Sequence, residues 1–146
     1  MRGGRGEDRE GERHEVRVEY RRFEDECATT IIGAAIEVQS HLGPGLVESA
    51  YEAALCHELG LRDVHFERQL RTPAIYKGLV LPDAYRVDVL VEHAVVVEIK
   101  AVEQLLPVHQ AQLLTYLRFT GKRLGLLLNF HATPLKAGIR RIANQL

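Results

Sequence analysis

The sequence is poor in cysteine and has no long apolar run. Its two cysteines, Cys27 and Cys56, form no CxxC pair, which argues against a disulfide framework and favours free thiols in a reducing compartment. No apolar stretch approaches the roughly 20 residues of a membrane helix, and the charged N-terminus does not resemble a secretory signal. The seven histidines lack HxxxH-type spacing, which argues against a zinc site. We therefore expect a cytoplasmic protein with no membrane partner.

The residues that are present suit one globular domain. The chain has 146 residues, of which 46% are hydrophobic and 27% are charged, and this is enough material for one buried core. Residues 1–22 consist mainly of Gly, Arg and Glu, a composition that buries little apolar surface. The sequence thus predicts a disordered charged tail over residues 1–22 and a single domain over residues 23–146.

Charge is distributed unevenly along the chain. The formal net charge is −1, yet residues 100–146 contain seven Lys or Arg and a single acid, Glu103. A local excess of positive charge is typical of surfaces that bind phosphate groups. Helix faces exposed to solvent give the same pattern, so both interpretations stay open.

Hydrophobic periodicity predicts both helices and strands. Helices are expected over residues 23–42, 46–59, 107–120 and 134–144, and strands over residues 64–69, 74–77, 79–81, 85–91, 95–100 and 124–130. Gly43-Pro44-Gly45 ends the first helix, and Gly78 and Pro82-Asp83 are interpreted as turns. The helix over residues 107–120 is a crossover, which makes its flanking strands parallel. The expected fold is α/β, with a mixed β-sheet flanked by helices on both faces.

Two opposite charges stand at the end of a strand that is otherwise apolar. Glu98 and Lys100 follow Val95-Val96-Val97 and, being two residues apart, share one face of the strand. Buried charges are costly unless they are paired, hydrated or bound to an ion. A simple Glu–Lys pair at the edge of the sheet is the alternative to a functional site.

Asp88 supplies a second acid. If the turn at Glu92-His93-Ala94 is centred on His93, Asp88 lies opposite Glu98 on the neighbouring strand, with Cβ atoms about 5 Å apart. Two carboxylates this close repel each other unless a cation lies between them, and carboxylate oxygens suit Mg²⁺ or Mn²⁺. A slip of one residue in the hairpin would turn Asp88 to the other face, and the sequence leaves this register open.

Lys100 would lie beside this ion. There it would orient or deprotonate a water molecule, or neutralise negative charge in the transition state. With Asp88, Glu98 and Lys100 as the catalytic set, the predicted reaction class is metal-assisted hydrolysis of a phosphodiester.

At this point the chain resembles a known group of proteins. Asp88 followed by Glu98-x-Lys100 on adjacent strands resembles the signature of the PD-(D/E)XK nuclease superfamily, although Val87 rather than proline precedes Asp88. Gly45-Leu46-Val47-Glu48-Ser49-Ala50-Tyr51 reads as G-x-x-E-x-x-Y and resembles the GxxExxY protein family of that superfamily. The resemblance covers about residues 24–144, with further matching stretches at residues 85–88, 98–103, 109–116 and 124–130.

The resemblance implies a restriction-endonuclease-like core and a nuclease dependent on Mg²⁺ or Mn²⁺. Its partner would be nucleic acid, with DNA favoured and RNA as the alternative. Asp88 and Glu98 would bind the metal. In related nucleases an acid from an early helix joins the metal shell, which implies this role for Glu48. Stabilisation of the helix dipole is the alternative for Glu48.

Residues of the crossover helix and beyond would contact the substrate. Gln112 and Tyr116 resemble the Gln-x-x-x-Tyr element of RecB-like members, which implies that they bind substrate or support Lys100. A polar-edged packing stripe is the alternative. Arg118 and Lys122 would bind the nucleic-acid backbone, together with Arg123, Arg140 and Arg141.

Other functions fit the same residues. A nucleic-acid-binding or assembly module could keep the nuclease fold without catalysis, because a fold does not determine a function. The charges could also form only a buried salt-bridge network. No helix-turn-helix, zinc-finger or RRM-type motif is present, so sequence-specific readout is not predicted. Substrate strandedness, cleavage mode, and assembly as a homodimer or with a partner protein are left open.

Overall fold

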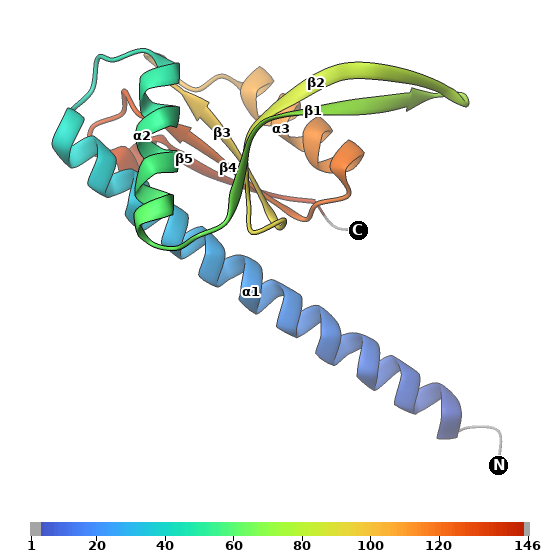
Figure 1. Cartoon of the computed structure of the whole chain (residues 1–146). Coiled ribbons are helices and arrows are strands. Elements are labelled where there is room, and N and C mark those ends of the chain that lie inside the picture. The colour runs from blue at the N-terminus through green and yellow to red at the C-terminus, as the bar shows by residue number, and fades with distance from the viewer. Residues whose placement is uncertain (1–3, 145–146) are drawn as a thin grey trace.

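The computed structural model describes the backbone of residues 4–144 and the side chains of Glu19 and of residues 21–144. Residues 4–144 form three α-helices and five strands, joined by short loops (Figure 1). The helices are α1 (Gly4–Leu42), α2 (Glu48–Leu61) and α3 (Pro107–Thr120), and the strands are β1 (Phe66–Tyr76), β2 (Leu79–Val91), β3 (Val95–Lys100), β4 (Leu124–Asn129) and β5 (Ile139–Ala143), with a short 3-10 helix at Leu135–Gly138.

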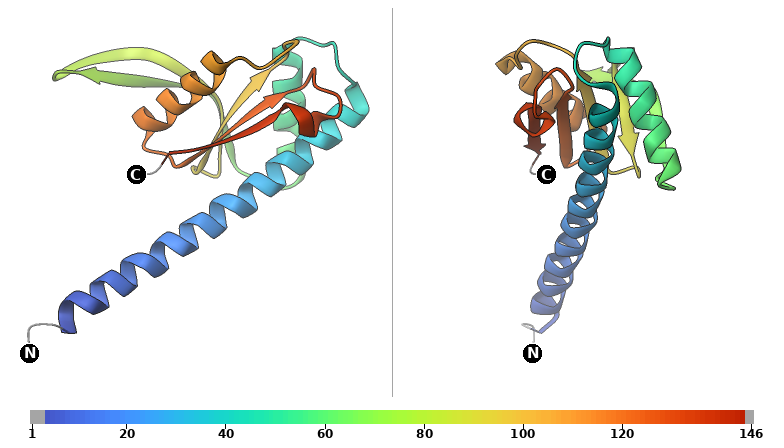
Figure 2. Two further views of the ribbon diagram at one scale, coloured as in Figure 1. Left: turned by 180° about the vertical axis from the view of Figure 1, so that it is seen from behind. Right: turned by 90° about the vertical axis from the view of Figure 1, so that its left-hand side faces the viewer.

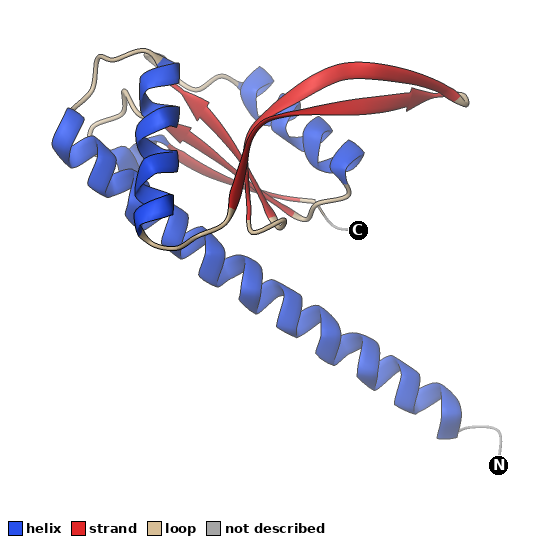
Figure 3. Cartoon of the chain, viewed as in Figure 1, coloured by secondary structure: helices blue, strands red, loops and turns tan. Residues whose placement is uncertain are grey.

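The strands form one mixed sheet in the order β1-β2-β3-β4-β5. β3 and β4 are parallel, as the crossover through α3 requires, and the other neighbours are antiparallel. Helices α1 and α2 cover one face of the sheet and α3 covers the other (Figure 3). The predicted α/β fold with helices on both faces is therefore confirmed.

Two apolar clusters hold the helices to the sheet. Val95, Val97 and Ile99 of β3 pack with α1 and α2, whereas Val96 packs with Leu113 of α3. This alternation follows from the period of two residues in a strand. All six residues of β4 are buried, as expected for a strand covered on both faces. Each fully buried aliphatic side chain contributes roughly 1.5–3 kcal/mol to stability.

Helix α1 is longer than the sequence predicted. Residues 4–22, which were predicted to be a disordered tail, continue the helix and project away from the rest of the protein (Figures 1 and 2). The later part of α1, Cys27–Val38, is the part buried against the sheet. Once that part is formed, each added residue gains a hydrogen bond without a new nucleation cost. Residues 1–3 of the predicted tail lie outside the described residues, and the domain boundary at residue 23 stays a prediction.

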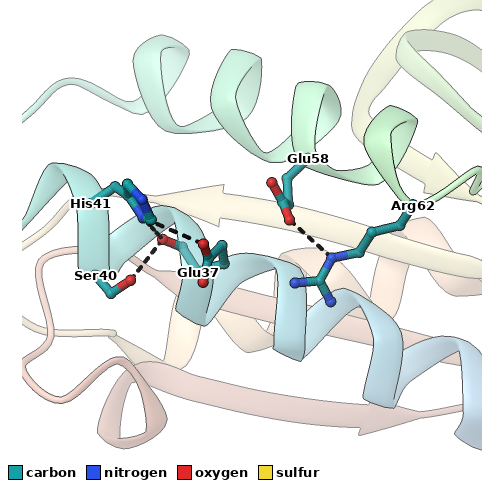
Figure 4. A network of polar contacts seen from close by, with 5 residues as sticks. All are labelled: Glu37, Ser40, His41, Glu58 and Arg62. Carbon is teal, nitrogen blue, oxygen red and sulfur yellow. Dashed lines mark hydrogen bonds and ion pairs between the residues drawn. The ribbon is translucent and has the colours of Figure 1, made fainter.

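None of the helices within residues 4–144 is long and apolar enough to cross a membrane. Cys27 and Cys56 are free and buried, as predicted. Ion pairs one turn apart join Glu37 to His41 within α1 and Glu58 to Arg62 within α2, and the Arg62 side chain points toward α1 (Figure 4). Such pairs contribute little to stability.

The C-terminal segment was predicted incorrectly. The helix expected over residues 134–144 is instead a single 3-10 turn followed by β5, which pairs antiparallel with β4. Since β4 is fully buried, its outer edge needs a partner for its backbone groups. Gly138 permits the tight turn, because a Cβ atom there would lie 2.7 Å from the carbonyl oxygen of Asn129. Pairing with the sheet thus overrides the local helical pattern.

β1 and β2 form one long hairpin, where the sequence predicted several short strands. The predicted turn lies at Lys77-Gly78, where both residues have positive φ. Pro82-Asp83, also predicted as a turn, is a bulge inside β2, because Thr72 pairs with Tyr85 and Ala74 pairs with Leu81. A bulge tolerates proline, which has no N–H for the ladder. The distal part of the hairpin projects past α3 (Figures 1 and 2).

Tyr51, the last residue of the G-x-x-E-x-x-Y motif, fixes the loop that precedes α2. Its hydroxyl accepts a hydrogen bond from the N–H of Leu46 (3.1 Å) and donates one to the carbonyl of Gly43 (2.5 Å). Its ring stacks on Phe130, with ring centroids 4.6 Å apart. Since the side chain is fully buried, water does not replace these hydrogen bonds easily.

Replacing Tyr51 with phenylalanine should therefore lower the free energy of unfolding by about 1–2 kcal/mol, because the loop keeps two unsatisfied backbone groups. Urea denaturation measures this change. Tyr76→Phe is the matched control, since Tyr76 is exposed near the tip of the hairpin. Equal stability of the two variants would contradict the assigned role.

Candidate active site

The hairpin between β2 and β3 has the register that brings Asp88 opposite Glu98. The ladder pairs Val91 with Val95, Leu90 with Val96 and Val89 with Val97, and then stops. Beyond it, the N–H of Ile99 donates to Asp88 Oδ2 (2.9 Å) and the N–H of Asp88 approaches Glu98 Oε1 (3.3 Å). Two carboxylates thus replace main-chain pairing at the point where the strands separate.

The side chains of β2 do not alternate strictly around Asp88. Val87 and Leu90 both pack in the α3 cluster, although they are three residues apart, while Val89 faces α1 and α2. Strict alternation along the strand predicted over residues 85–91 would place Val87 and Val89 on one face, and this expectation is wrong. Across the hairpin, Gln69 has a φ of 50° and lies between the pairs Arg68–Val89 and Leu70–Val87. Asp88 thus lies opposite this irregularity, and its carboxylate accepts the hydrogen bond from Ile99 of β3.

The environment of these acids disfavours their charged forms. Glu98 is 5% exposed, and burial followed by the charge of Asp88 raises its pKa to about 8. Burial also raises the pKa of Asp88, against the opposing effects of the Ile99 N–H and of Lys100. The charge of Lys100 lowers the pKa of both acids. The structure thus brings together the three residues that the sequence predicted as the catalytic set.

A third acid near this site, Glu52 of α2, was missed by the sequence analysis. It is 6% exposed, it binds Arg68 (2.9 Å) and Gln69 (2.5 Å), and its charge raises the pKa of Asp88. The sequence signal that could have identified Glu52 is its position: it is an acid within the apolar stripe of α2, one turn after Glu48.

Glu48 itself is exposed in the first turn of α2. Among the hydrogen bonds and ion pairs of the described side chains, none joins Glu48 to Asp88, Glu98 or Lys100. The metal-binding role of Glu48 stays a prediction.

Helix α3 brings Gln112 and Tyr116 toward the acids from the other face of the sheet. Burial raises the pKa of Tyr116, the charges of Glu98 and Asp88 raise it further, and a hydrogen bond with Gln112 lowers it. The ring of Tyr116 stacks on Tyr85 of β2, with centroids 4.7 Å apart. The predicted pair therefore lies within electrostatic range of the acids, and its role in substrate binding stays a prediction.

The predicted phosphate-binding cations are not gathered at the acids. Lys122 precedes β4, and β4 runs parallel to β3 with Lys100 paired to Asn129, so Lys122 lies about 20 Å away from Lys100 along the sheet. Arg118 is exposed in the last turn of α3. Arg141 of β5 forms an ion pair with Asp25 of α1. The basic side chains of the β1–β2 hairpin lie closer in sequence to Asp88, and Arg71 and Arg86 are cross-strand neighbours there.

Asn129, at the end of β4, fixes the segment that follows Lys100. It is buried, and its side chain accepts a hydrogen bond from the N–H of Val102 (3.1 Å) and donates one to the carbonyl of Val102 (2.9 Å). A polar residue at the end of an apolar strand was the sequence signal for this role. Asn129 thus holds the chain at the point where Lys100 leaves the sheet.

The comparisons with known proteins agree with this architecture. The model of the PD-(D/E)XK nuclease superfamily matches residues 25–142, a range that runs from the buried part of α1 into β5. No curated protein and no solved structure matches the chain. Nucleases of this superfamily typically depend on a divalent metal ion, and their restriction-endonuclease-like core is a mixed sheet of the kind found here. The chain belongs to the PD-(D/E)XK nuclease superfamily.

Proposed function

We propose that this protein is a nuclease that uses Mg²⁺ or Mn²⁺ to hydrolyse phosphodiester bonds, with DNA as the favoured substrate, and that it belongs to the GxxExxY family. The observation that carries the proposal is the pair Asp88 and Glu98, held where β2 and β3 separate. Each carboxylate has an oxygen directed to a backbone N–H of the opposite strand. Their positions are thus fixed before any ligand binds, as a catalytic site requires.

The donor set fits a hard divalent cation. Asp88 and Glu98 would hold the ion through carboxylate oxygens. Both pKa values are raised by burial, so a cation between the acids would relieve their repulsion. When bound, such an ion polarises the phosphoryl group and acidifies a water molecule. The proposal includes one further acid from α2. The sequence predicted Glu48 for this position, whereas Glu52 is the acid of α2 whose charge raises the pKa of Asp88.

Lys100 would act on the water or on the phosphate. It ends β3 and follows Glu98 by two residues, on the same face of the strand, and it is partly exposed. Its Nζ would donate a hydrogen bond to the attacking water or to a non-bridging phosphate oxygen and so stabilise developing negative charge.

Substrate would lie between α3 and the β1–β2 hairpin. Gln112 and Tyr116 would contact a phosphate or support Lys100, since they lie near the acids. Arg71 and Arg86 would hold the nucleic-acid backbone on the hairpin. Arg118 and Lys122 would extend this contact along α3 only for a substrate long enough to reach them.

A cleavage screen tests the proposal. Single-stranded, duplex and branched DNA and RNA of matched sequence are incubated with the full chain in Mg²⁺, in Mn²⁺ or in EDTA. We expect cleavage of at least one DNA substrate with Mg²⁺ or Mn²⁺ and none with EDTA.

Calorimetric titration with Mg²⁺ and binding of the same nucleic acids accompany the screen. Binding of metal and nucleic acid without cleavage of any substrate would support the alternative, a non-catalytic module that keeps the fold. If neither Mg²⁺ nor Mn²⁺ bound, both functions would be contradicted in favour of a structural salt-bridge network.

A further inference from the structure

A second group of metal-ligating side chains lies at the other end of β3. His65 precedes β1, Glu67 is in β1, and His93 is in the turn between β2 and β3. One potential ligand atom from each lies within 4.8 Å of the others. Within the part of the chain that the structure describes, no other three His, Cys, Asp or Glu side chains meet this criterion. No local spacing in the sequence marks this cluster, because the antiparallel pairing of β1 with β2 brings its residues together.

We propose that His65, Glu67 and His93 form a binding site for a transition-metal ion such as Zn²⁺. Two imidazole nitrogens and one carboxylate oxygen are a donor set that suits Zn²⁺ and not Mg²⁺, which prefers oxygen ligands. Water would complete the coordination. This site does not rest on the proposed nuclease activity, since its ligands are separate from Asp88 and Glu98.

Part of the coordination geometry is already present. His93 Nδ1 and Glu67 Oε1 are 3.3 Å apart, and two ligands on a tetrahedral zinc ion, each bound at about 2.0–2.2 Å, are separated by about 3.4 Å. The rings of His65 and His93 have centroids 4.7 Å apart. Since all the ligand atoms lie within 4.8 Å of one another, the longest separation would have to shorten by at most about 1.4 Å. Both histidines are exposed, so rotation of their side chains can supply this movement.

Hydrogen bonds hold the backbone around the cluster in place without any ion. The N–H of Glu92 donates to the carbonyl of His65 (2.9 Å), and the N–H of His65 donates to Glu92 Oε1 (2.9 Å). Glu92 and His93 have φ values of 53° and 55°, a conformation that turns of this kind usually give to Asn or Gly. A turn that keeps two larger polar residues at such positions is a candidate for a functional role. Glu92 also adds negative charge beside the proposed cation.

The two metal sites are far enough apart to be separated by experiment. His93 and Glu98 are five residues apart along the chain, which corresponds to about 16 Å in an extended strand. A bound ion would link the start of β1 to the β2–β3 turn and so stabilise the folded protein.

Zinc titration of the tag-free full chain tests this inference. We expect one tight Zn²⁺ site per chain by calorimetry, distinct from weaker binding to the carboxylates of Asp88 and Glu98. We also expect a rise in the thermal unfolding midpoint with Zn²⁺ and a visible absorption spectrum of tetrahedral type with Co²⁺. His65→Ala and His93→Ala should each weaken Zn²⁺ binding at least tenfold. Since both side chains are exposed, circular dichroism should show that the variants remain folded.

Two controls make the assignment specific. His41→Ala removes an exposed histidine that pairs with Glu37, one turn earlier in α1 (Figure 4), and should bind Zn²⁺ like the parent. The double variant Asp88→Asn, Glu98→Gln should also bind Zn²⁺ like the parent. The inference is overturned if Zn²⁺ does not bind, if His93→Ala binds it with unchanged affinity, or if the double variant loses it.

Discussion

Lys100→Ala should reduce metal-dependent cleavage by on the order of 10²–10⁴-fold, the usual contribution of a side chain that transfers or orients a proton in the transition state. Lys100 is the cation whose charge acts on both Asp88 and Glu98. Removing it leaves both carboxylates in place, so Mg²⁺ should still bind. Single-turnover cleavage and calorimetric Mg²⁺ titration measure the two properties separately.

Asp88→Asn provides the contrast, because it should lose Mg²⁺ binding and cleavage together. Lys136→Ala is the matched control: Lys136 is exposed in the 3-10 turn before β5, and its removal should leave the cleavage rate within about twofold of the parent, since surface substitutions away from a site have small effects. If Lys100→Ala cleaved as fast as the parent, the role assigned to Lys100 would be wrong.

The register of the β2–β3 hairpin was left open by the sequence, because β3 is apolar on both faces. A slip of one residue would turn Asp88 to the other face, yet the valines of β3 would stay buried, since helices cover both sides of the sheet. The structure has the register expected for a turn centred on His93, with Val89 paired to Val97. The parallel pairing of β3 with β4 could be predicted, since a helix of fourteen residues joins them and a crossover of this length returns the chain in the same direction.

The C-terminal strand could not be predicted, because its cause is not local. Residues 134–144 have spacing compatible with a helix, but the exposed edge of β4 offers backbone partners for β5 along its length. Leaving the backbone N–H and C=O groups along that edge of β4 without hydrogen-bond partners would cost more free energy than the helical preference of one short segment provides. The bulge at Pro82-Asp83 has the same origin, since local sequence favours a turn and pairing along the long hairpin continues past it.

The two acids and the lysine of the candidate site could be predicted from the sequence, but the residues around them could not. Asp88, Glu98 and Lys100 are recognisable as charges in apolar strands. By contrast, Glu52 reaches the site only because α2 packs beside Arg68 and Gln69. Contacts between elements that are distant in sequence depend on packing, which periodicity does not specify.

The second large effect concerns Glu98 and stability. In a chelator that keeps divalent ions away, Glu98→Gln should raise the free energy of unfolding at pH 9 by on the order of 3 kcal/mol. Burial and the charge of Asp88 raise the pKa of Glu98 from 4.5 to about 8. Glutamine has the shape of the protonated acid and never ionises, so the variant avoids the cost of a buried negative charge.

The sign of the pH dependence follows from the two pKa values. Below pH 4.5 the Glu98 carboxyl is protonated in both the folded and the unfolded chain. In this range its contribution to the free energy of unfolding is fully present. As the pH rises from 4.5 to about 8, the unfolded chain releases the proton that the folded chain retains, so stability falls by up to about 1.4 kcal/mol per pH unit. Above that range the folded carboxyl also ionises, and the loss stops. Asp88, with a raised pKa of its own, acts in the same direction.

Urea denaturation in EDTA between pH 5 and pH 9 measures this difference, with Glu103→Gln as the control at an exposed acid. The parent should lose stability relative to Glu98→Gln across the range, whereas Glu103→Gln should follow the parent. Parallel profiles for the parent and Glu98→Gln would show that Glu98 ionises as easily in the folded chain as in the unfolded one.

The direction of this change also separates a metal site from a salt-bridge network. If Glu98 served only to neutralise Lys100, glutamine would leave a cation without its partner and would lower stability at neutral and alkaline pH. If Glu98 instead lies beside Asp88 to bind a divalent ion, its buried charge lowers the stability of the metal-free protein. Glutamine should then raise the free energy of unfolding without metal, and Mg²⁺ should no longer stabilise the variant as it stabilises the parent. We therefore expect Glu98→Gln to stabilise the metal-free protein and to remove its response to metal. This is the behaviour of an acid that serves binding, because binding sites retain charges that folding alone would not favour.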